Sequence, residues 1–329
     1  MNILITGGAG FIGSHLSDEL LSRGHQVTVL DNLRNGSLQN LEIAQQHAGF
    51  KFVKGDILNS SACLESTREI NCVFHLACLG VRHSLHSPLE NHRVNAEGTL
   101  NVLDACVKNG VKRFFYISTS EIYGGVNLFP ISEETIPRPF TVYGASKLAG
   151  EHYSQAYSRY YGLKTTILRI FNNYGPRAHY EGDAGEIIPR TIVYALYDKR
   201  PVIFGDGSIT RDFFYVKDTA SALAGFLEIE TLDGMTMNIG TGKEYSMSEI
   251  VGKVLALTGK RELGIEYIAA RPADVPRLWV NAEKFYRLTG FVPKFIFADG
   301  LLQTIVYYKK LAEMKNLLAD IQTRNWEKK

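Results

Sequence analysis

The stretch TGGAGFIG, residues 6–13, decides the fold of this chain. It directly follows the apolar run at residues 2–5 and precedes a segment of helical periodicity, a context that predicts a strand, a glycine-rich turn and a helix. Such a turn lets the backbone approach a pyrophosphate, and the helix presents free N–H groups and the positive end of its dipole to it. The residues expected to bind a dinucleotide here are Gly7, Gly10, Phe11, Ile12 and Gly13.

A carboxylate follows at the distance that such a loop requires. Asp31 ends the second predicted strand, about 20 residues after the turn, where an acid accepts hydrogen bonds from an adenosine ribose. We expect Asp31 and the adjacent Asn32 to bind the cofactor. An acid at this position disfavours a 2′-phosphate, so NAD is the expected cofactor, while the nearby Arg34 keeps NADP as an alternative.

Short β-branched runs alternate with longer helical patterns through the first half of the chain, which is typical of βαβ units and a parallel sheet. We therefore expect an α/β fold with a doubly wound parallel sheet of the Rossmann type. The expected strands are residues 3–6, 26–30, 51–55, 72–76, 111–118 and 165–170. The expected helices are residues 11–22, 60–69, 88–108 and 143–161.

The alternation loosens after about residue 172, where Gly, Pro and Arg become frequent, and this predicts a smaller α+β lobe. Residues 1–171 would then bind the dinucleotide and residues 172–329 the substrate, with elements near residues 201–228 returning to the first lobe. Most helices of the second half are expected in the second lobe, at residues 185–197, 218–227, 246–258, 282–288 and 298–318. Residues 324–329 are expected to be a solvated end.

Composition excludes several classes of protein. With 45% hydrophobic and 21% charged residues, the chain reads as an ordinary globule. Its net charge of +2 comes from scattered Lys and Arg, which argues against a nucleic-acid partner. No apolar run is long enough for a membrane span, and the four cysteines lack zinc-ligand spacing. We expect no metal and no membrane, and a reduced, cytoplasmic protein.

Polar and small residues gather where predicted strands end. Ligands of an open parallel sheet lie beyond the carboxyl ends of its strands, so these residues are expected to line the nucleotide cleft. After the third and fourth strands the candidates are Asp56, Ile57, Leu76 and Ala77. His75, in the fourth strand, is more simply a core histidine. The run STSEIYG after the fifth strand places Thr119, Ser120 and Glu121 at the same edge.

Tyr143 and Lys147, in YGASKLAGE, lie four residues apart in a predicted helix and therefore on one face. A free phenol has a pKa near ~10, so it is a poor base at neutral pH unless a cation favours the phenolate. Lys147 could supply that cation. The pair therefore predicts a proton-abstracting site.

Taken together, TGGAGFIG, HLAC, NAEGTLNVL, STSEIYG, YGASKLAGE, RIFNNYGPR and GDGSITRDFFYV resemble the extended short-chain dehydrogenase/reductase family of nucleotide-sugar epimerases and dehydratases. The resemblance spans nearly the whole chain. It implies that Thr119 hydrogen-bonds the sugar hydroxyl, that Tyr143 is the base and that Lys147 holds the nicotinamide ribose. It also implies bound NAD that takes a hydride from sugar C4. The residues implied to meet the substrate diphosphate are Asn172, Arg211 and Arg277.

Family resemblance leaves the reaction after C4 oxidation open. Glu121 favours a 4,6-dehydratase, because a C5 proton α to a C4 ketone can be removed by a carboxylate and the C6 hydroxyl can then leave. Ser120 stands where related deoxythymidine-sugar dehydratases carry an acid, so Ser120, a relayed water or Glu121 itself would protonate the leaving group. A 4-epimerase and a UDP-glucuronate decarboxylase are the alternatives.

The expected partner is a nucleotide-diphosphate sugar. The resemblance also implies a homodimer formed through two helices per subunit, those starting near Pro88 and Tyr143. A different class of function, an NAD- and nucleotide-binding subunit without catalysis, is disfavoured by the presence of Thr119, Tyr143 and Lys147, because a binding module needs no base.

Overall fold

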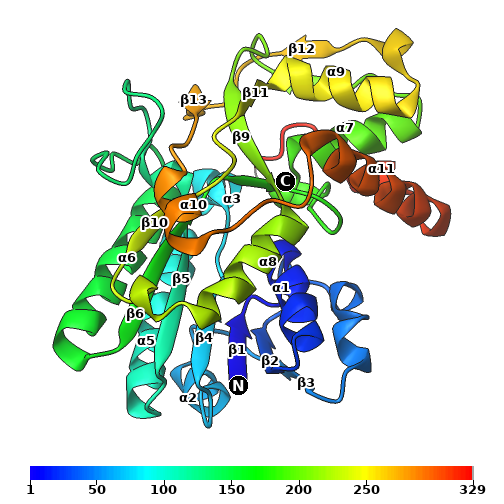
Figure 1. Cartoon of the computed structure of the whole chain (residues 1–329). Helices are drawn as coiled ribbons and strands as arrows, with labels where there is room; N and C mark the ends of the chain where they lie inside the picture. Colours follow the sequence, from blue (N-terminus) through cyan, green and yellow to red (C-terminus); the bar gives the residue numbers. More distant parts are fainter. Residues whose placement is uncertain (328–329) are drawn as a thin grey trace.

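The computed structural model describes residues 1–327, and a seven-stranded parallel sheet forms the centre of its larger lobe (Figure 1). The strand order is β10-β6-β5-β4-β1-β2-β3. The bounds are Asn2–Thr6 (β1), Gln26–Asp31 (β2), Phe50–Lys54 (β3), Cys72–His75 (β4), Arg113–Thr119 (β5), Lys164–Ile170 (β6) and Thr236–Ile239 (β10). All six predicted strands are present. The direction of winding reverses between β1 and β4, which confirms the doubly wound fold and puts a crevice at their carboxyl ends.

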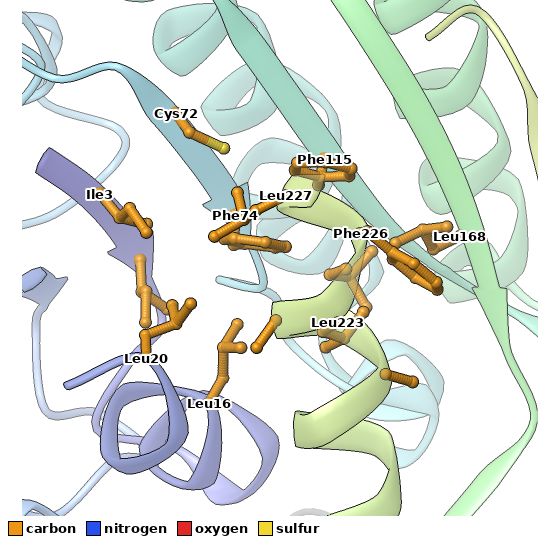
Figure 2. Close-up of a cluster of buried hydrophobic side chains, with 14 of the residues drawn as sticks. Ile3, Leu16, Leu20, Cys72, Phe74, Phe115, Leu168, Leu223, Phe226 and Leu227 are labelled. Carbon is orange, nitrogen blue, oxygen red and sulfur yellow. The ribbon is translucent and has the colours of Figure 1, made fainter. Parts of the chain in front are cut away.

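Side chains alternate between two helical layers that cover the sheet. Ile3 and Ile5 face the layer that contains α1 (Phe11–Ser22) and α8 (Val216–Gly225), whereas Leu4 faces the other. Figure 2 shows the first layer, where Leu16 and Leu20 of α1 and Leu223 of α8 lie over Phe74 and Phe115. The opposite layer consists of α2 (Ser60–Ser66), α5 (Gly98–Lys108) and α6 (Val142–Tyr161). This burial on both faces explains why the strands read as nearly continuous apolar runs.

The two lobes interleave more than the sequence indicated. β10, which was not predicted, pairs in parallel with β6 and so returns residues 236–239 to the large sheet. α8 lies in the range 201–228 that was expected to return to the first lobe, and Phe226, which follows it, lies in the core of the large sheet. α10 (Glu283–Thr289) was expected in the second lobe, but its Phe285 lies in the same core. The chain therefore passes between the two lobes more than once after residue 172.

The smaller lobe is built from short strands and longer helices. Its strands are β7 (Asn172–Tyr174), β8 (Val202–Phe204), β9 (Thr210–Tyr215), β11 (Glu244–Ser246), β12 (Glu266–Ile268) and β13 (Arg277–Leu278). β9 pairs with β7, β11 and β13, while β8 pairs with β12. The helices α7 (Ile187–Leu196), α9 (Met247–Thr258) and α11 (Phe297–Met314) complete it. They enclose a separate core that contains Ile192, Val254 and Ile305.

The predicted helix at residues 88–108 is divided. α4 (Pro88–His92) passes through a π-helical turn at Arg93–Glu97 into α5. The turn places Asn91 and Asn95 against the loop after β4, because Asn95 accepts from Leu79 N (2.8 Å) and both asparagines donate to Leu79 O. The irregular turn thus fixes a loop that borders the crevice, as π-bulges often do at functional positions.

His75 is a core residue, as the sequence suggested. It is fully buried between two hydroxyls, with Thr6 Oγ1 2.7 Å from Nδ1 and Thr99 Oγ1 3.0 Å from Nε2. Burial lowers the pKa of His75 from 6.5 to about 3. Between these two values the unfolded chain binds a proton that the folded chain does not.

His75 should therefore contribute stability that is complete above pH 6.5 and is lost as the pH falls toward about 3. Urea titrations of His75→Gln across this range should show a shallower fall in the free energy of unfolding, by about 1.4 kcal/mol per pH unit. The exposed His47, replaced in the same way, is the control and should leave the slope unchanged. Equal slopes for the parent and His75→Gln would contradict this assignment.

The two helices expected at a dimer interface present apolar side chains to the outside. Leu89 of α4 is 82% exposed and Tyr160 of α6 is 83% exposed. The homodimer stays a prediction. Within residues 1–327, no helix has the length and apolar character needed to cross a membrane.

Candidate active site

A cavity of about 530 Å³ opens at the carboxyl ends of the large sheet and continues into the smaller lobe. Its walls come from the loops after β1 to β5 on one side and from β7, α7, β8 and β9 on the other. The crevice predicted from the reversal of strand order is therefore closed over by the second lobe. Within the described chain, no group of three or more metal-binding side chains was found.

The glycine-rich loop fits a pyrophosphate at one end of this cavity. Gly7 has φ +71°, and a Cβ there would lie 2.7 Å from the backbone of Ala77. A Cβ on Gly13 would lie 2.5 Å from Gly7 O, so glycine is needed for the helix to approach the loop. α1 begins after Gly10 without a side-chain cap or an acid in its first turn. Its first N–H groups and its dipole remain available to an anion.

Asp31 lies at the end of β2, lines the cavity and also supports the loop. Its Oδ2 accepts from Ala9 N at 3.0 Å and its Oδ1 from Leu33 N at 2.8 Å, while burial raises its pKa. Asp56 accepts from Asn32 Nδ2 at 2.9 Å, which joins the ends of β2 and β3. The remaining predicted cofactor residues also line the cavity, namely Gly7, Gly10, Phe11, Ile12, Gly13, Ile57, Leu76 and Ala77.

Arg34, because of which NADP was retained as an alternative cofactor, is held by a carboxylate. Its guanidinium binds both carboxylate oxygens of Glu90, with Nη2 3.0 Å from Oε2, and also contacts His83 Nε2 at 3.2 Å. All three residues line the cavity. A bidentate pair of this kind holds the arginine in a fixed geometry. Glu90 therefore competes with any phosphate for Arg34.

Releasing Arg34 should shift cofactor preference. We expect Glu90→Gln to tighten NADP binding by about tenfold or more, because a charge-assisted contact to a 2′-phosphate contributes ~1.5–3 kcal/mol. Calorimetric titrations with NAD and NADP measure the change, and NAD affinity should stay nearly constant. Glu97→Gln, which breaks the exposed pair with Arg93, is the matched control. An unchanged NADP affinity in Glu90→Gln would mean that Glu90 does not restrain Arg34.

The five predicted catalytic residues meet at one wall of the cavity. Thr119 ends β5, and its hydroxyl accepts from Glu121 N at 3.2 Å. α6 starts after Thr141, whose side chain accepts from Gly144 N, and brings Tyr143 and Lys147 to the cavity one turn apart. The spacing argument thus placed both side chains correctly.

Burial dominates the electrostatics of this pair. It raises the pKa of Tyr143 well above 10, and a hydrogen bond with Thr119 opposes that rise. Lys147 is 2% exposed, with Nζ 4.4 Å from the centre of the Tyr116 ring, and burial lowers its pKa. Burial therefore favours the neutral phenol of Tyr143, which is the opposite of the lowered pKa that the helix spacing suggested.

Glu121 lies among arginines. Burial raises its pKa, and the charges of Arg211, Arg271 and Arg82 lower it. Arg211 and Arg271 share Asp274, at 3.1 and 2.8 Å, so two guanidinium groups meet one carboxylate. All of these residues line the cavity. The planar donor groups of Arg211 and Arg271, both in the cavity wall, suit the oxygen atoms of a diphosphate.

Arg277, predicted to bind the substrate, lies outside the cavity. It pairs with Glu244, and its guanidinium carbon is 4.5 Å from the Phe129 ring and 4.9 Å from the Trp279 ring. Arg271, which the sequence reasoning did not select, lines the cavity in its place. Both arginines belong to RPADVPR, residues 271–277, and the sequence reasoning considered only the second of them.

Asn172 lines the cavity as expected. Its Oδ1 is buried and has no hydrogen-bond partner. A buried polar atom of this kind is costly unless something binds to it. It therefore indicates a ligand with a donor group in this part of the cavity.

Known proteins resemble this chain in both fold and sequence. A profile of the NAD dependent epimerase/dehydratase family matches residues 3–240. The putative UDP-glucose 4-epimerase of Methanocaldococcus jannaschii is 34% identical over 93% of this chain and 98% of its own. UDP-glucuronic acid decarboxylase 1 of Xenopus tropicalis is 31% identical, over 94% and 73%. The solved dTDP-glucose 4,6-dehydratase of Streptomyces venezuelae, with NAD and TYD bound, has a TM-score of 0.90 and 30% identity, over 95% and 98%. The chain therefore belongs to the NAD dependent epimerase/dehydratase family, and NAD is its cofactor.

Proposed function

We propose that the chain is a nucleotide-sugar 4,6-dehydratase, which oxidises sugar C4, eliminates water across C5 and C6 and releases a 4-keto-6-deoxy sugar. The observation that supports this most strongly is the position of Glu121, a carboxylate in the same cavity wall as Thr119 and Tyr143. Burial raises the pKa of Glu121, which makes its ionised form a stronger base than an exposed glutamate.

Tyr143 removes the proton of the C4 hydroxyl, and Thr119 hydrogen-bonds that oxygen. NAD supplies the acceptor for the two electrons and, when bound, a positively charged ring in the cavity. Lys147 holds the cofactor ribose and adds its charge to the same region. These two positive charges together offset the effect of burial, which in the protein alone keeps Tyr143 protonated.

Elimination follows from the ketone. The C5 proton is acidic once C4 carries a carbonyl, and Glu121 removes it. The C6 hydroxyl then leaves as water with a proton that Ser120 relays or Glu121 returns. The hydride taken from C4 adds to C6 of the resulting alkene and a proton adds to C5, so no net oxidation or reduction occurs. Ser120 is buried at the same wall, which keeps bulk water from competing with this transfer.

The diphosphate of the substrate binds Arg211, Arg271 and the side-chain N–H group of Asn172, while Asn172 Oδ1 accepts from a donor group of the ligand. The two arginines offer planar forks of donors, which suit phosphate oxygens, and Asp274 holds both in orientation. Arg277 has no part in this proposal, because Glu244 already pairs with it outside the cavity.

A second candidate is a nucleotide-sugar 4-epimerase. The relative from Methanocaldococcus jannaschii, with 34% identity over 93% of this chain, is a putative UDP-glucose 4-epimerase. Epimerisation would use Thr119, Tyr143 and Lys147 in the same way but would need no base at C5. A UDP-glucuronate decarboxylase is a further alternative, since such a relative is 31% identical.

One experiment separates these reactions. The protein is incubated with a panel of UDP-, dTDP- and GDP-sugars in deuterated water, and the products are examined by NMR. Deuterium at C5 with loss of the C6 oxygen supports dehydration. Inversion at C4 without solvent label, or release of carbon dioxide, would contradict the proposal and assign an epimerase or a decarboxylase instead.

A further inference from the structure

The end of the described chain is folded against the active-site lobe. The sequence predicted a solvated end at residues 324–329, but Asn325 is 1% exposed and its Nδ2 donates to Gly185 O at 3.1 Å. Trp326 lies with its ring edge against Phe204, at a centroid distance of 4.7 Å. In Figure 1 the red segment after α11 turns back and runs past α7. Residues 328 and 329 lie outside the described chain.

This C-terminal segment, residues 321–327, holds a buried arginine. Arg190 of α7 is 6% exposed, and its Nη2 donates to the carbonyls of Gln322 and Thr323, both at 3.1 Å. Its guanidinium carbon is 5.8 Å from the centre of the Phe204 ring. The segment therefore fixes Arg190 from one side and supports the ring of Phe204 from another.

Within residues 1–327, Arg190 forms no ion pair with a carboxylate. Its guanidinium donates there to the carbonyls of Gln322 and Thr323 and also interacts with the Tyr194 phenol. Burial is the largest influence on the pKa of Arg190 and lowers it, Tyr194 opposes that shift, and the charges of Arg82 and Arg271 add to it. A buried charge without an ionised partner is costly, so an arrangement that retains one points to an electron-rich ligand.

The place for that ligand is the part of the cavity formed by α7 and β8. Gly185, Arg190, Tyr194, Val202 and Phe204 line it, whereas the catalytic residues come from β5 and α6. The cavity therefore has an end that contains the catalytic residues and a second end that contains an aromatic ring and a guanidinium with no carboxylate partner among residues 1–327. Aromatic rings and arginine forks suit the base and oxygen atoms of a nucleotide.

We propose that Arg190 binds oxygen atoms of the substrate nucleotide and that the C-terminal segment positions it for this task. The inference rests on the proposed function, because it assumes a nucleotide sugar as the substrate. Gln322 and Thr323 hold the guanidinium through their carbonyls, and Trp326 keeps the Phe204 ring in place beside it. The segment is thus part of the nucleotide site without touching the reacting sugar.

Full-length variants test this assignment by calorimetry with UDP, dTDP, GDP and NAD. Arg190→Gln should weaken binding of the nucleoside diphosphate that the parent binds by about tenfold or more, as expected for the loss of a charge-assisted contact. Trp326→Ala should weaken it in the same direction, and Trp326→Phe should restore most of the affinity. Lys108→Gln, which breaks an exposed pair with Asp104 on α5, is the control and should bind like the parent.

The affinity for NAD and the thermal midpoint separate this effect from misfolding. Both should stay near the parent values in Arg190→Gln. If Arg190→Gln and Trp326→Ala bind NAD normally and still bind the nucleoside diphosphate as tightly as the parent, the inference is wrong. If the parent itself binds NAD but none of UDP, dTDP and GDP, the nucleotide-sugar function fails, and the inference fails with it.

Discussion

Tyr143→Phe is expected to lower turnover by about a thousandfold, within the range for loss of a general base. The substitution removes only the phenol oxygen, so the ring still fills its place beside Thr119 and the cavity wall is preserved. Steady-state turnover measures the loss. Calorimetry with NAD and UDP should give affinities close to those of the parent.

Tyr160→Phe is the matched control, because Tyr160 lies on the same helix and is 83% exposed. It should retain full activity. Parent-like turnover of Tyr143→Phe would remove the tyrosine from the mechanism. A parent chain that binds NAD and UDP but turns over no nucleotide sugar would instead favour the non-catalytic binding subunit.

Glu121→Gln is expected to slow formation of the 4-keto-6-deoxy product by about a hundredfold to ten-thousandfold. The amide cannot remove the C5 proton, but oxidation at C4 does not need it. The variant should therefore stop after the first step and accumulate the absorbance of reduced nicotinamide. Stopped-flow absorbance and product NMR measure the two steps separately.

The acid side of the pH profile provides a second readout for Glu121. Burial raises its pKa above 4.5, so the active, ionised base is lost at a higher pH than for an exposed glutamate as the solution is acidified. Activity of the parent should thus rise with pH through this raised pKa. The small residual rate of Glu121→Gln should lack that dependence.

A different result would reassign Glu121. Its backbone N–H donates to the Thr119 hydroxyl, so the residue also orients the group that contacts the sugar. If the Glu121 side chain only helped to orient Thr119, Glu121→Gln would slow C4 oxidation, and hydrogen exchange at C5 would slow by the same factor. If the enzyme were a 4-epimerase, the variant would still invert C4.

Local patterns predicted the parts of the site that local geometry controls. The glycine loop follows from the steric demands of Gly7 and Gly13, and the helix spacing of Tyr143 and Lys147 follows from one helical turn. Strands buried on both faces were found from their apolar runs. These features depend on a few adjacent residues, so the sequence carries their signal directly.

Features that depend on distant contacts were missed. β10 has only four residues, and its pairing with β6 spans about seventy residues of chain that the local pattern does not connect. Arg271 and Arg277 differ in their carboxylate partners. Arg271 pairs with Asp274 in the cavity wall, whereas Arg277 pairs with Glu244 outside the cavity. The contacts of Asn325 and Trp326 likewise form only when the C-terminal segment packs against Gly185 and against Phe204 of β8.

Electrostatics at Tyr143 could not be predicted from spacing either. The neighbouring Lys147 suggested a lowered pKa, whereas the folded protein shows that burial outweighs it. Desolvation depends on the whole surrounding packing, which a four-residue motif does not describe.

The most direct test follows a deuterium atom placed at C4 of the nucleotide sugar. Dehydration makes C6 the electron-poor end of an alkene conjugated to the C4 ketone, so the label removed from C4 should reappear at C6 of the product. NMR of the product locates it. Deuterium at C6 is the result expected here. Deuterium that returns to C4, with the C6 oxygen retained or carbon dioxide released, would contradict the central claim.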